Sequence, residues 1–392
     1  MENDRLRNTE SVSIFTRLGP TLICLKGNPE NKIWQLIKDE IQWEKTGSDA
    51  SAVQPDLFMQ VLDRPEFDFY VPEVYSAKEN LSFNENGIFV REKDFEYLVE
   101  NLFDETGTCK AYIFPGVDKL RKIVIQFLNY FINPAYSNIH LITKNSIMSY
   151  SFFWFVLALL MLRKKAAFVH SGIVSKNEKS LMLIGTGGSG KTSITFKILE
   201  EDKDFKYVAE DFGVVDSNGE TFFIPKYLSI YASDTKSQQI LKEYVENFSF
   251  WKKLRWNIGT KLLKRNPMIK ASPFEVLGKE RIAFKSKLGT AIYLIRARVD
   301  SPILEEISTE EITERSLYAS FRELKRLLEI FLLLKANSVN DIYIPTFKDI
   351  EERTRAVYKC FFSKVNRLKL IIPFYWSPGE TAKFILKEDL FS

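Results

Sequence analysis

A glycine-rich octapeptide near the middle of the chain constrains the fold more than any other stretch. It reads Gly185-Thr186-Gly187-Gly188-Ser189-Gly190-Lys191-Thr192 and fits the pattern G-x-x-x-x-G-K-[ST]. In such a loop the backbone N–H groups surround nucleotide phosphates, the lysine reaches the terminal phosphates, and the final hydroxyl binds Mg²⁺. An apolar run precedes this phosphate loop at 181–184 and a helical pattern follows at 193–201, so the helix N-terminus would face the phosphates. We expect all eight residues to bind a nucleotide; the alternative is an ordinary glycine-rich turn.

An acidic pair follows shortly after the loop. A short helix and a turn lead to a second apolar run, 205–209, which ends in Glu210 and Asp211. Because so brief a connection favours neighbouring strands, we expect the strands at 181–184 and 205–209 to pair side by side. One carboxylate could then hold Mg²⁺ through water, and the other could accept a proton from an attacking hydroxyl. The alternative is a solvated acidic pair at a strand end.

A further apolar run, 166–174, precedes the phosphate loop and predicts a β-hairpin with it, because 175–179 is turn-like. In an ordinary P-loop NTPase, by contrast, the strand before the loop is parallel to its neighbours, and long crossovers connect them. The chain here resembles the HPr kinase family and its phosphoenolpyruvate carboxykinase-like relatives. The resemblance rests on His170-Ser-Gly172, the octapeptide, and Ala209-Glu-Asp211, in the order and spacing of that family, and covers 166–225 well.

The resemblance implies a kinase that uses ATP and Mg²⁺, and it implies roles for single residues. Lys191 and Thr192 would bind phosphates and Mg²⁺, and Asp211 would be the metal-side carboxylate. His170 would lie near the transferred phosphoryl group; a plain core position is its alternative. Glu210 stands where the family usually has an aspartate acting as base, so Glu210 is the candidate base with a longer side chain.

Three later cations are candidates for phosphate contacts. Arg296 and Arg298 lie on one face of a strand expected at 291–299, and either would suit the late arginine that such kinases use to neutralise transition-state charge. Two solvent-facing arginines are an equal alternative. Lys226, just after a hairpin expected around Asn218-Gly219, is a weaker candidate.

The leading functional hypothesis is transfer of the γ-phosphoryl group of ATP to a hydroxyl, in particular a serine of a peptide or protein. Two alternatives stay open: a kinase of small metabolites, and a regulatory or assembly module that binds ATP without catalysis. The resemblance also implies a homo-oligomer.

Residues 234–271 read as a basic insert in the kinase-like part. Cations alternate there with large apolar side chains, as in an amphipathic helix. The simplest interpretation is a surface helix with a solvated basic face. The sharper ones are docking of an acidic protein or peptide acceptor and contact with an anionic membrane surface. The cations are Lys252, Lys253, Arg255, Lys261, Lys264, Arg265 and Lys270.

Composition narrows the class of protein. The net charge of +4 over 392 residues is too small to indicate a nucleic-acid partner. The three cysteines have neither disulfide nor metal-ligand spacing, and the N-terminus lacks the apolar core of a signal peptide, so we expect a cytoplasmic protein. The apolar segment 147–162 is too short in its uninterrupted part, 152–162, to cross a bilayer, and we expect a buried helix rather than a transmembrane span.

These observations predict an α/β fold with α+β elements. Residues 1–116 form a smaller mixed α/β module with strands at 21–25, 58–62 and 110–114, a hairpin around Asn86-Gly87, and a helix at 31–44. Residues 117–165 would be connecting helices, including an amphipathic one at 117–132. Residues 166–392 would be an HPr kinase-like ATP-binding domain that contains the phosphate loop and the insert.

Overall fold

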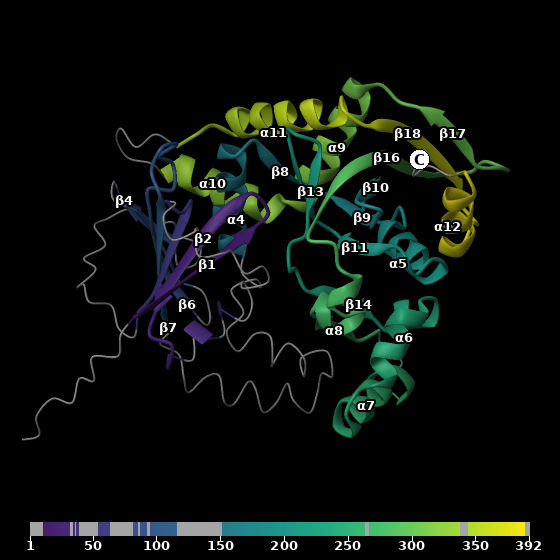
Figure 1. The fold of residues 1–392 in the computed structure, drawn as a ribbon, viewed down its shortest axis with the longest axis horizontal. Helices are drawn as coiled ribbons and strands as arrows, with labels where there is room; N and C mark the ends of the chain where they lie inside the picture. The colour runs from purple at the N-terminus through teal and green to yellow at the C-terminus, as the bar shows by residue number, and fades with distance from the viewer. Residues whose placement is uncertain are drawn as a thin grey trace, which may run out of the picture.

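The computed structural model describes residues 11–31, 34–35, 37–38, 54–62, 81–84, 87–91, 95–115, 151–262, 266–337 and 344–388. Within these ranges the chain forms two large β-sheets and a small two-stranded one, with helices packed against them (Figure 1). The predicted α/β class with α+β elements is confirmed. The predicted helix at 117–132 lies outside the described residues.

The N-terminal sheet has seven strands in the order β1-β2-β3-β7-β6-β5-β4. β2, β3 and β7 run parallel, and the other neighbours are antiparallel. The predicted strands and hairpin of this region are present, and the described part of the predicted helix at 31–44 is helical at 34, 35, 37 and 38. The bounds are β1 (Val12–Leu18), β2 (Thr21–Gly27), β3 (Leu57–Val61), β4 (Leu81–Asn84), β5 (Gly87–Arg91), β6 (Phe95–Glu100) and β7 (Cys109–Pro115).

The second sheet has nine strands and leads into the phosphate loop. Seven follow the order β11-β9-β10-β16-β13-β12-β8, and β18 pairs with both β16 and β17. β10 and β18 run parallel to β16 on its two sides. The bounds are β8 (Ala166–Val169), β9 (Ser171–Lys176), β10 (Lys179–Ile184), β11 (Lys206–Ala209), β12 (Gly213–Asp216), β13 (Glu220–Phe222), β16 (Lys285–Ala297), β17 (Ile303–Glu306) and β18 (Asn366–Pro373).

The strand order of this sheet differs from the predicted one. β10 and β11 are not neighbours, because β9 lies between them and pairs antiparallel with both. The predicted hairpin before the phosphate loop is confirmed for β9 and β10, with a turn at Asn177 and Glu178 whose φ angles of 51° and 63° are left-handed. The single run predicted at 166–174 is instead divided at His170 into β8, which pairs with β12, and β9. Since β9 and β16 already occupy both edges of β10, the short crossover places β11 one strand further out. The second predicted hairpin, β12 with β13, is also confirmed.

Helices cover both sheets, and two of them begin at predicted caps. Ser308 accepts a hydrogen bond from the Glu311 N–H, and Ser377 forms a capping box with Glu380. The helix predicted through residue 335 is interrupted at Leu324 and forms two helices. The bounds are α4 (Ser151–Arg163), α5 (Lys191–Glu201), α6 (Gln239–Glu246), α7 (Phe250–Asn257), α8 (Pro273–Leu277), α9 (Thr309–Glu323), α10 (Lys325–Asn337), α11 (Phe347–Phe362) and α12 (Pro378–Lys387).

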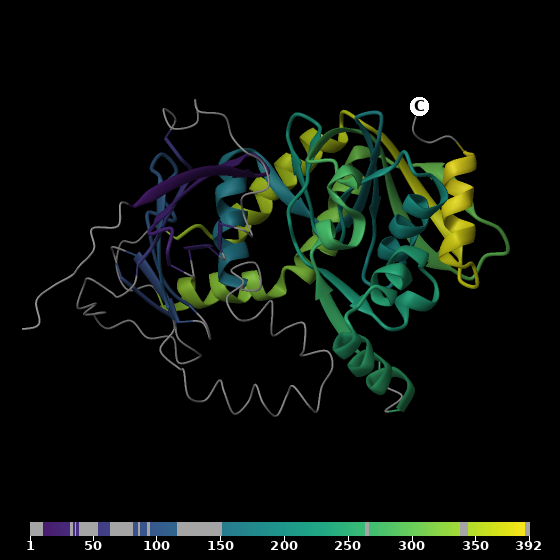
Figure 2. The ribbon, with the colours of Figure 1, turned by 60° about the horizontal axis from the view of Figure 1, so that its bottom comes forward.

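The N-terminal sheet shares one hydrophobic core with α4 and α10. In both ribbon views α4 lies between the two large sheets (Figures 1 and 2). Phe155, Leu157 and Met161 of α4 are buried in it, so the predicted buried helix is confirmed. No helix in the described part of the chain is both long and apolar enough to cross a membrane.

The insert folds as a small subdomain at the end of the second sheet. β14 (Leu228–Tyr231) pairs with β15 (Met268–Ala271), and α6, α7 and a π-helical turn, Ile258–Leu262, lie between them. α7 projects from the body at the bottom of both ribbon views (Figures 1 and 2). Lys264 and Arg265 lie outside the described residues.

Candidate functional site

The phosphate loop joins the end of β10 to the start of α5. Gly188 and Gly190 have φ angles of 84° and 95°, which side chains rarely adopt. A Cβ at Gly188 would meet nothing, whereas one at Gly190 would lie 3.2 Å from Nη2 of Arg296. Backbone conformation therefore requires glycine at the first position, and conformation and space together require it at the second. The loop leads directly into α5, whose N-terminal amides have no side-chain cap.

Lys191 is enclosed by its own loop. Its Nζ donates hydrogen bonds to the carbonyl oxygens of Gly185 at 2.8 Å and Thr186 at 3.1 Å. Burial lowers the pKa of Lys191 to about 8, although the carboxylates of Asp211, Glu323 and Glu210 act in the opposite direction. The site thus holds a desolvated cation where phosphates are expected.

The acidic pair lies beside the loop, although β11, which precedes the pair, is separated from β10 by β9. Oγ1 of Thr192 donates a hydrogen bond to Oε1 of Glu210 at 2.5 Å. Burial, and next the charge of Asp211, raise the pKa of Glu210, while the hydrogen bond from Thr192 lowers it less. The last residue of the loop and the first of the pair are therefore in direct contact.

Asp211 is held in an unusual backbone turn. Its φ is 69°, and the Phe212 N–H donates to the Glu210 carbonyl at 2.8 Å across it, which is a γ-turn of the rare form with positive φ. Nζ of Lys226 donates to Oδ2 of Asp211, and Nδ1 of His170 lies 3.4 Å from Oδ1. Burial alone would raise the pKa of Asp211, but the His170 and Lys226 contacts outweigh it and lower that pKa well below its usual value.

His170 lies at the junction of β8 and β9, beside the acidic pair. Its backbone N–H donates to Oγ of Ser320 at 3.0 Å, and its Nδ1 is 2.8 Å from the Asp211 carbonyl oxygen. A carbonyl oxygen only accepts, so Nδ1 carries a proton and donates it in this contact. Nε2 is buried and has no hydrogen-bond partner among the described residues. The ring therefore keeps one nitrogen that no described residue engages.

Arg296, near the end of β16, contacts the other side of the loop. Its Nε donates to the Ser189 carbonyl at 3.3 Å, and its Nη1 donates to the carbonyls of Phe374 at 3.2 Å and Trp376 at 3.0 Å. Of the two predicted arginines, Arg296 is thus placed against the phosphate loop. Arg298 follows the end of the strand.

Two charged side chains complete the site. Lys226 was a weak candidate from its place after a hairpin, and it also lies 4.4 Å from the centre of the Phe212 ring. Glu323, at the end of α9, was not predicted; its Oε1 would lie 3.3 Å from a Cβ added at Gly187. No sequence motif near Glu323 indicates this role, because α9 is distant from the loop in the sequence and only tertiary packing brings the two together.

The residues present fit Mg²⁺ and a nucleotide. No group of three or more His, Cys, Asp or Glu side chains among the described residues could hold a metal by itself. Mg²⁺ needs fewer protein ligands than such a group supplies, because it keeps several waters and is bound by one or two carboxylates together with substrate phosphates. The Thr192 hydroxyl and the acidic pair supply such oxygens. Oγ of Ser189, in the loop, is buried and has no hydrogen-bond partner in the described structure, which suits a donor to phosphate.

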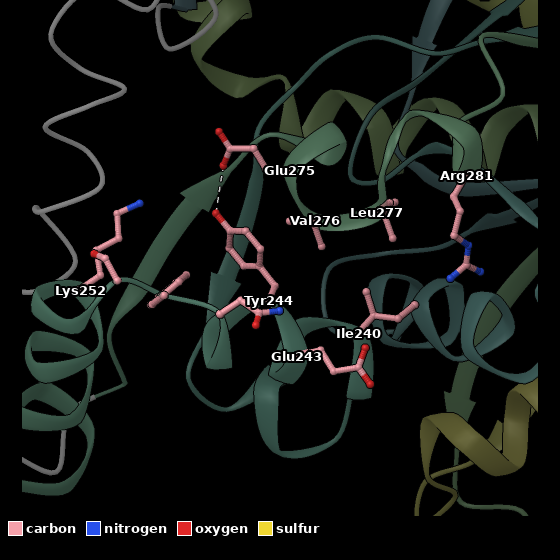
Figure 3. A pocket seen from close by; sticks show the side chains of 11 residues that line it. Ile240, Glu243, Tyr244, Lys252, Glu275, Val276, Leu277 and Arg281 are labelled. Carbon is pink, nitrogen blue, oxygen red and sulfur yellow. Dashed lines mark hydrogen bonds between the residues drawn. The ribbon is translucent and has the colours of Figure 1, made fainter.

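A pocket of about 560 Å³ lies apart from the loop, between α6, α8 and the start of α7 (Figure 3). The hydroxyl of Tyr244 donates to Glu275 across it at 3.0 Å. Glu243 and Glu275 balance Lys252 and Arg281 in its lining, so the pocket does not select for the charge of a ligand.

Comparison with known proteins gives little. No protein-family model matches the chain. No curated protein matches it either. Among solved structures, the HPr(Ser) kinase/phosphatase from Coxiella burnetii is similar at 9% sequence identity and a TM-score of 0.27, over 57% of this chain and 96% of that one. A TM-score this low supports no inference, so the function is argued from the residues of this chain.

Proposed function

We propose that this chain is a Mg·ATP-dependent kinase that transfers the γ-phosphoryl group to a hydroxyl, namely a serine of a peptide or protein. The observation that carries the proposal is the contact of Thr192 with Glu210, which joins the phosphate loop to the acidic pair. A loop at a helix N-terminus binds phosphates, and an adjoining carboxylate is what activation of a hydroxyl requires.

The roles of the residues follow from their charges. The loop amides, Lys191 and Ser189 hold the phosphates, and Thr192 with Asp211 holds Mg²⁺, which neutralises phosphate charge when bound. The lowered pKa of Asp211 keeps it ionised, as a metal-side carboxylate must be. The raised pKa of Glu210 moves it toward the working pH, which suits a general base. His170 orients Asp211 and lies near the transferred group.

The proposal also covers the domain organisation, the cellular compartment and the oligomeric state. We assign the N-terminal module to 1–116, the connecting helices to 117–165 and the kinase-like domain to 166–392. Cys24, Cys109 and Cys360 are free thiols, which supports a reducing cytoplasm. The homo-oligomer stays a prediction that light scattering after gel filtration will test.

One experiment tests the function. The purified protein is incubated with γ-labelled ATP and with the products of neighbouring genes, both polypeptides and small molecules, and Lys191→Ala serves as the blank. Acid-stable label on a serine of a polypeptide is the expected result. Label on a metabolite would establish a small-molecule kinase, and tight ATP binding without transfer would establish a regulatory module.

A further inference from the structure

α7 presents large apolar side chains to solvent. Phe250 and Trp251 are 71% and 66% exposed, and Leu254 and Ile258 are each 40% exposed. The spacing 250, 254, 258 places three of them in one row that runs from α7 to the first residue of the π-helical turn, with Trp251 beside it. The rings of Phe250 and Trp251 contact each other edge to face, with centroids 5.4 Å apart. Aromatic side chains this exposed on a soluble surface indicate an interaction site.

The helix is held firmly from its other side. Trp256 is buried and packs edge to face on Phe248 at 6.2 Å, so it is core and not an anchor for a partner. Nζ of Lys253 donates to the Glu246 carbonyl at 2.8 Å. The exposed row is therefore a fixed feature of the subdomain.

The charged side chains of the segment that carries this row have one sign. Between residues 249 and 266 the sequence has six lysines and arginines and no aspartate or glutamate. Of the side chains described, Lys253 and Lys261 are exposed and Lys252 is partly exposed. Glu246, on the preceding helix, lies 3.9 Å from Lys242. The row is thus flanked by cations that have no acidic neighbour on their own helix.

Shape decides which anionic partner fits. The row lies on a projecting helix (Figure 2) and not in a groove, and a peptide acceptor needs a groove to bury its own side chains. A lipid interface accepts a projecting helix, with Phe, Trp and Leu entering the headgroup region and lysines meeting anionic headgroups. We propose that α7 and the π-helical turn after it dock this protein on an anionic membrane surface, with Phe250, Trp251, Leu254 and Ile258 as the inserted row and Lys252, Lys253 and Lys261 as its cationic flank.

The test is vesicle binding by the full chain without nucleotide, which makes it independent of the proposed kinase activity. Co-sedimentation is measured with phosphatidylcholine vesicles containing phosphatidylglycerol and with phosphatidylcholine alone. Binding to the anionic vesicles only is expected, with a blue shift of tryptophan emission that Trp251→Phe removes. Each cation near such a surface contributes about fivefold, so Lys252→Gln/Lys253→Gln/Lys261→Gln should weaken partitioning roughly 100-fold.

The matched control is Lys325→Gln/Lys348→Gln/Lys383→Gln, which makes the same change of net charge at exposed lysines of α10, α11 and α12. It should leave vesicle binding within about twofold, since exposed charges are screened beyond roughly 8 Å. If a lysine variant unfolds early, Phe250→Ser/Trp251→Ser gives the same test through the apolar row. Equal loss in the control, or binding of an acidic polyglutamate peptide to α7 without vesicle binding, overturns the proposal.

Discussion

Lys191 is a buried cation. Its contribution to nucleotide binding can be measured separately from the effect of its burial on the stability of the fold. Lys191→Ala should weaken Mg·ATP binding about 100-fold, because charge-assisted hydrogen bonds to phosphate are lost. Isothermal titration calorimetry measures this. Lys197→Ala is the matched control, because Lys197 lies on the same helix and pairs with Glu200 at 2.6 Å. Equal affinities of the two variants would mean that the loop does not bind nucleotide.

The lowered pKa of Lys191 has a consequence for stability. Below about pH 8 the folded protein holds a buried charge, whereas in the unfolded chain lysine titrates near 10.5. The unfolded state therefore binds more protons between these values, and stability rises with pH there. The free energy of unfolding of the wild type relative to Lys191→Met should rise by about 3 kcal/mol from near pH 7 to above pH 10. Urea unfolding at both pH values measures it, and a constant difference would contradict the shift.

The acidic pair allows its two roles to be separated. Glu210→Gln should leave Mg·ATP binding nearly unchanged and reduce phosphoryl transfer by 10² to 10⁴-fold, on the order expected for losing a general base. Asp211→Asn should weaken Mg²⁺-dependent binding itself. Titration calorimetry with and without Mg²⁺, together with single-turnover kinetics, distinguishes them. Equal loss of metal-dependent binding in both variants would show that the division of roles is wrong.

The raised pKa of Glu210 also predicts a pH profile. As pH falls through this pKa, Glu210 takes up a proton and can no longer act as base, so kcat/KM falls. The acid limb should therefore lie above the usual range of a glutamate and should be absent from the residual activity of Glu210→Gln. If the acid limb persists in Glu210→Gln, the group that takes up the proton is not Glu210.

At the scale of elements, Arg296 joins the phosphate loop to the turn between β18 and α12. Its planar fork reaches three carbonyls, of Ser189, Phe374 and Trp376, which a lysine does not match. Arg296→Lys should raise KM for ATP about tenfold, the effect of losing one charge-assisted bond. Arg298→Lys is the control and should change little. Steady-state kinetics of both variants measures this, and equal effects would mean that Arg296 does not organise the loop.

Local patterns predicted local elements well. The phosphate loop, the three hairpins and the caps at Ser308 and Ser377 follow from residues a few positions apart, where turn and cap chemistry acts. The position of β9 between β10 and β11 could not be predicted from local patterns. The length of a connection limits the distance between two strands, but it does not say whether another strand already pairs with the edge between them. Glu323 and Ser320 were missed for a related reason: α9 is brought to the site by long-range packing.

At the scale of the whole molecule, the N-terminal sheet is not an independent unit, since α4 and α10 complete its core. Leu157 of α4 is fully buried there. Leu157→Ala should cost about 2–5 kcal/mol and lower the stability of both sheets together. The control Leu332→Ala, on α10 and 55% exposed, should change stability by less than about 0.5 kcal/mol.

Circular dichroism and tryptophan emission during urea unfolding measure this prediction. Coincident transitions are expected from both probes. Two separated transitions, only one of which moves in Leu157→Ala, would show that the two sheets unfold separately.

The pairing of β16 also governs how the chain reaches this structure. Ser189 and Arg296 are 107 residues apart in the chain, yet Nε of Arg296 donates a hydrogen bond to the Ser189 carbonyl in the loop. Loop-closure entropy opposes such distant pairings, and parallel strands that meet late slow the folding of a chain. We therefore expect residues 185–192 to reach this conformation only after β16 has been synthesised. If the loop binds nucleotide as proposed, a ribosome-bound fragment that ends before β16 should carry the complete glycine motif and still fail to retain a nucleotide.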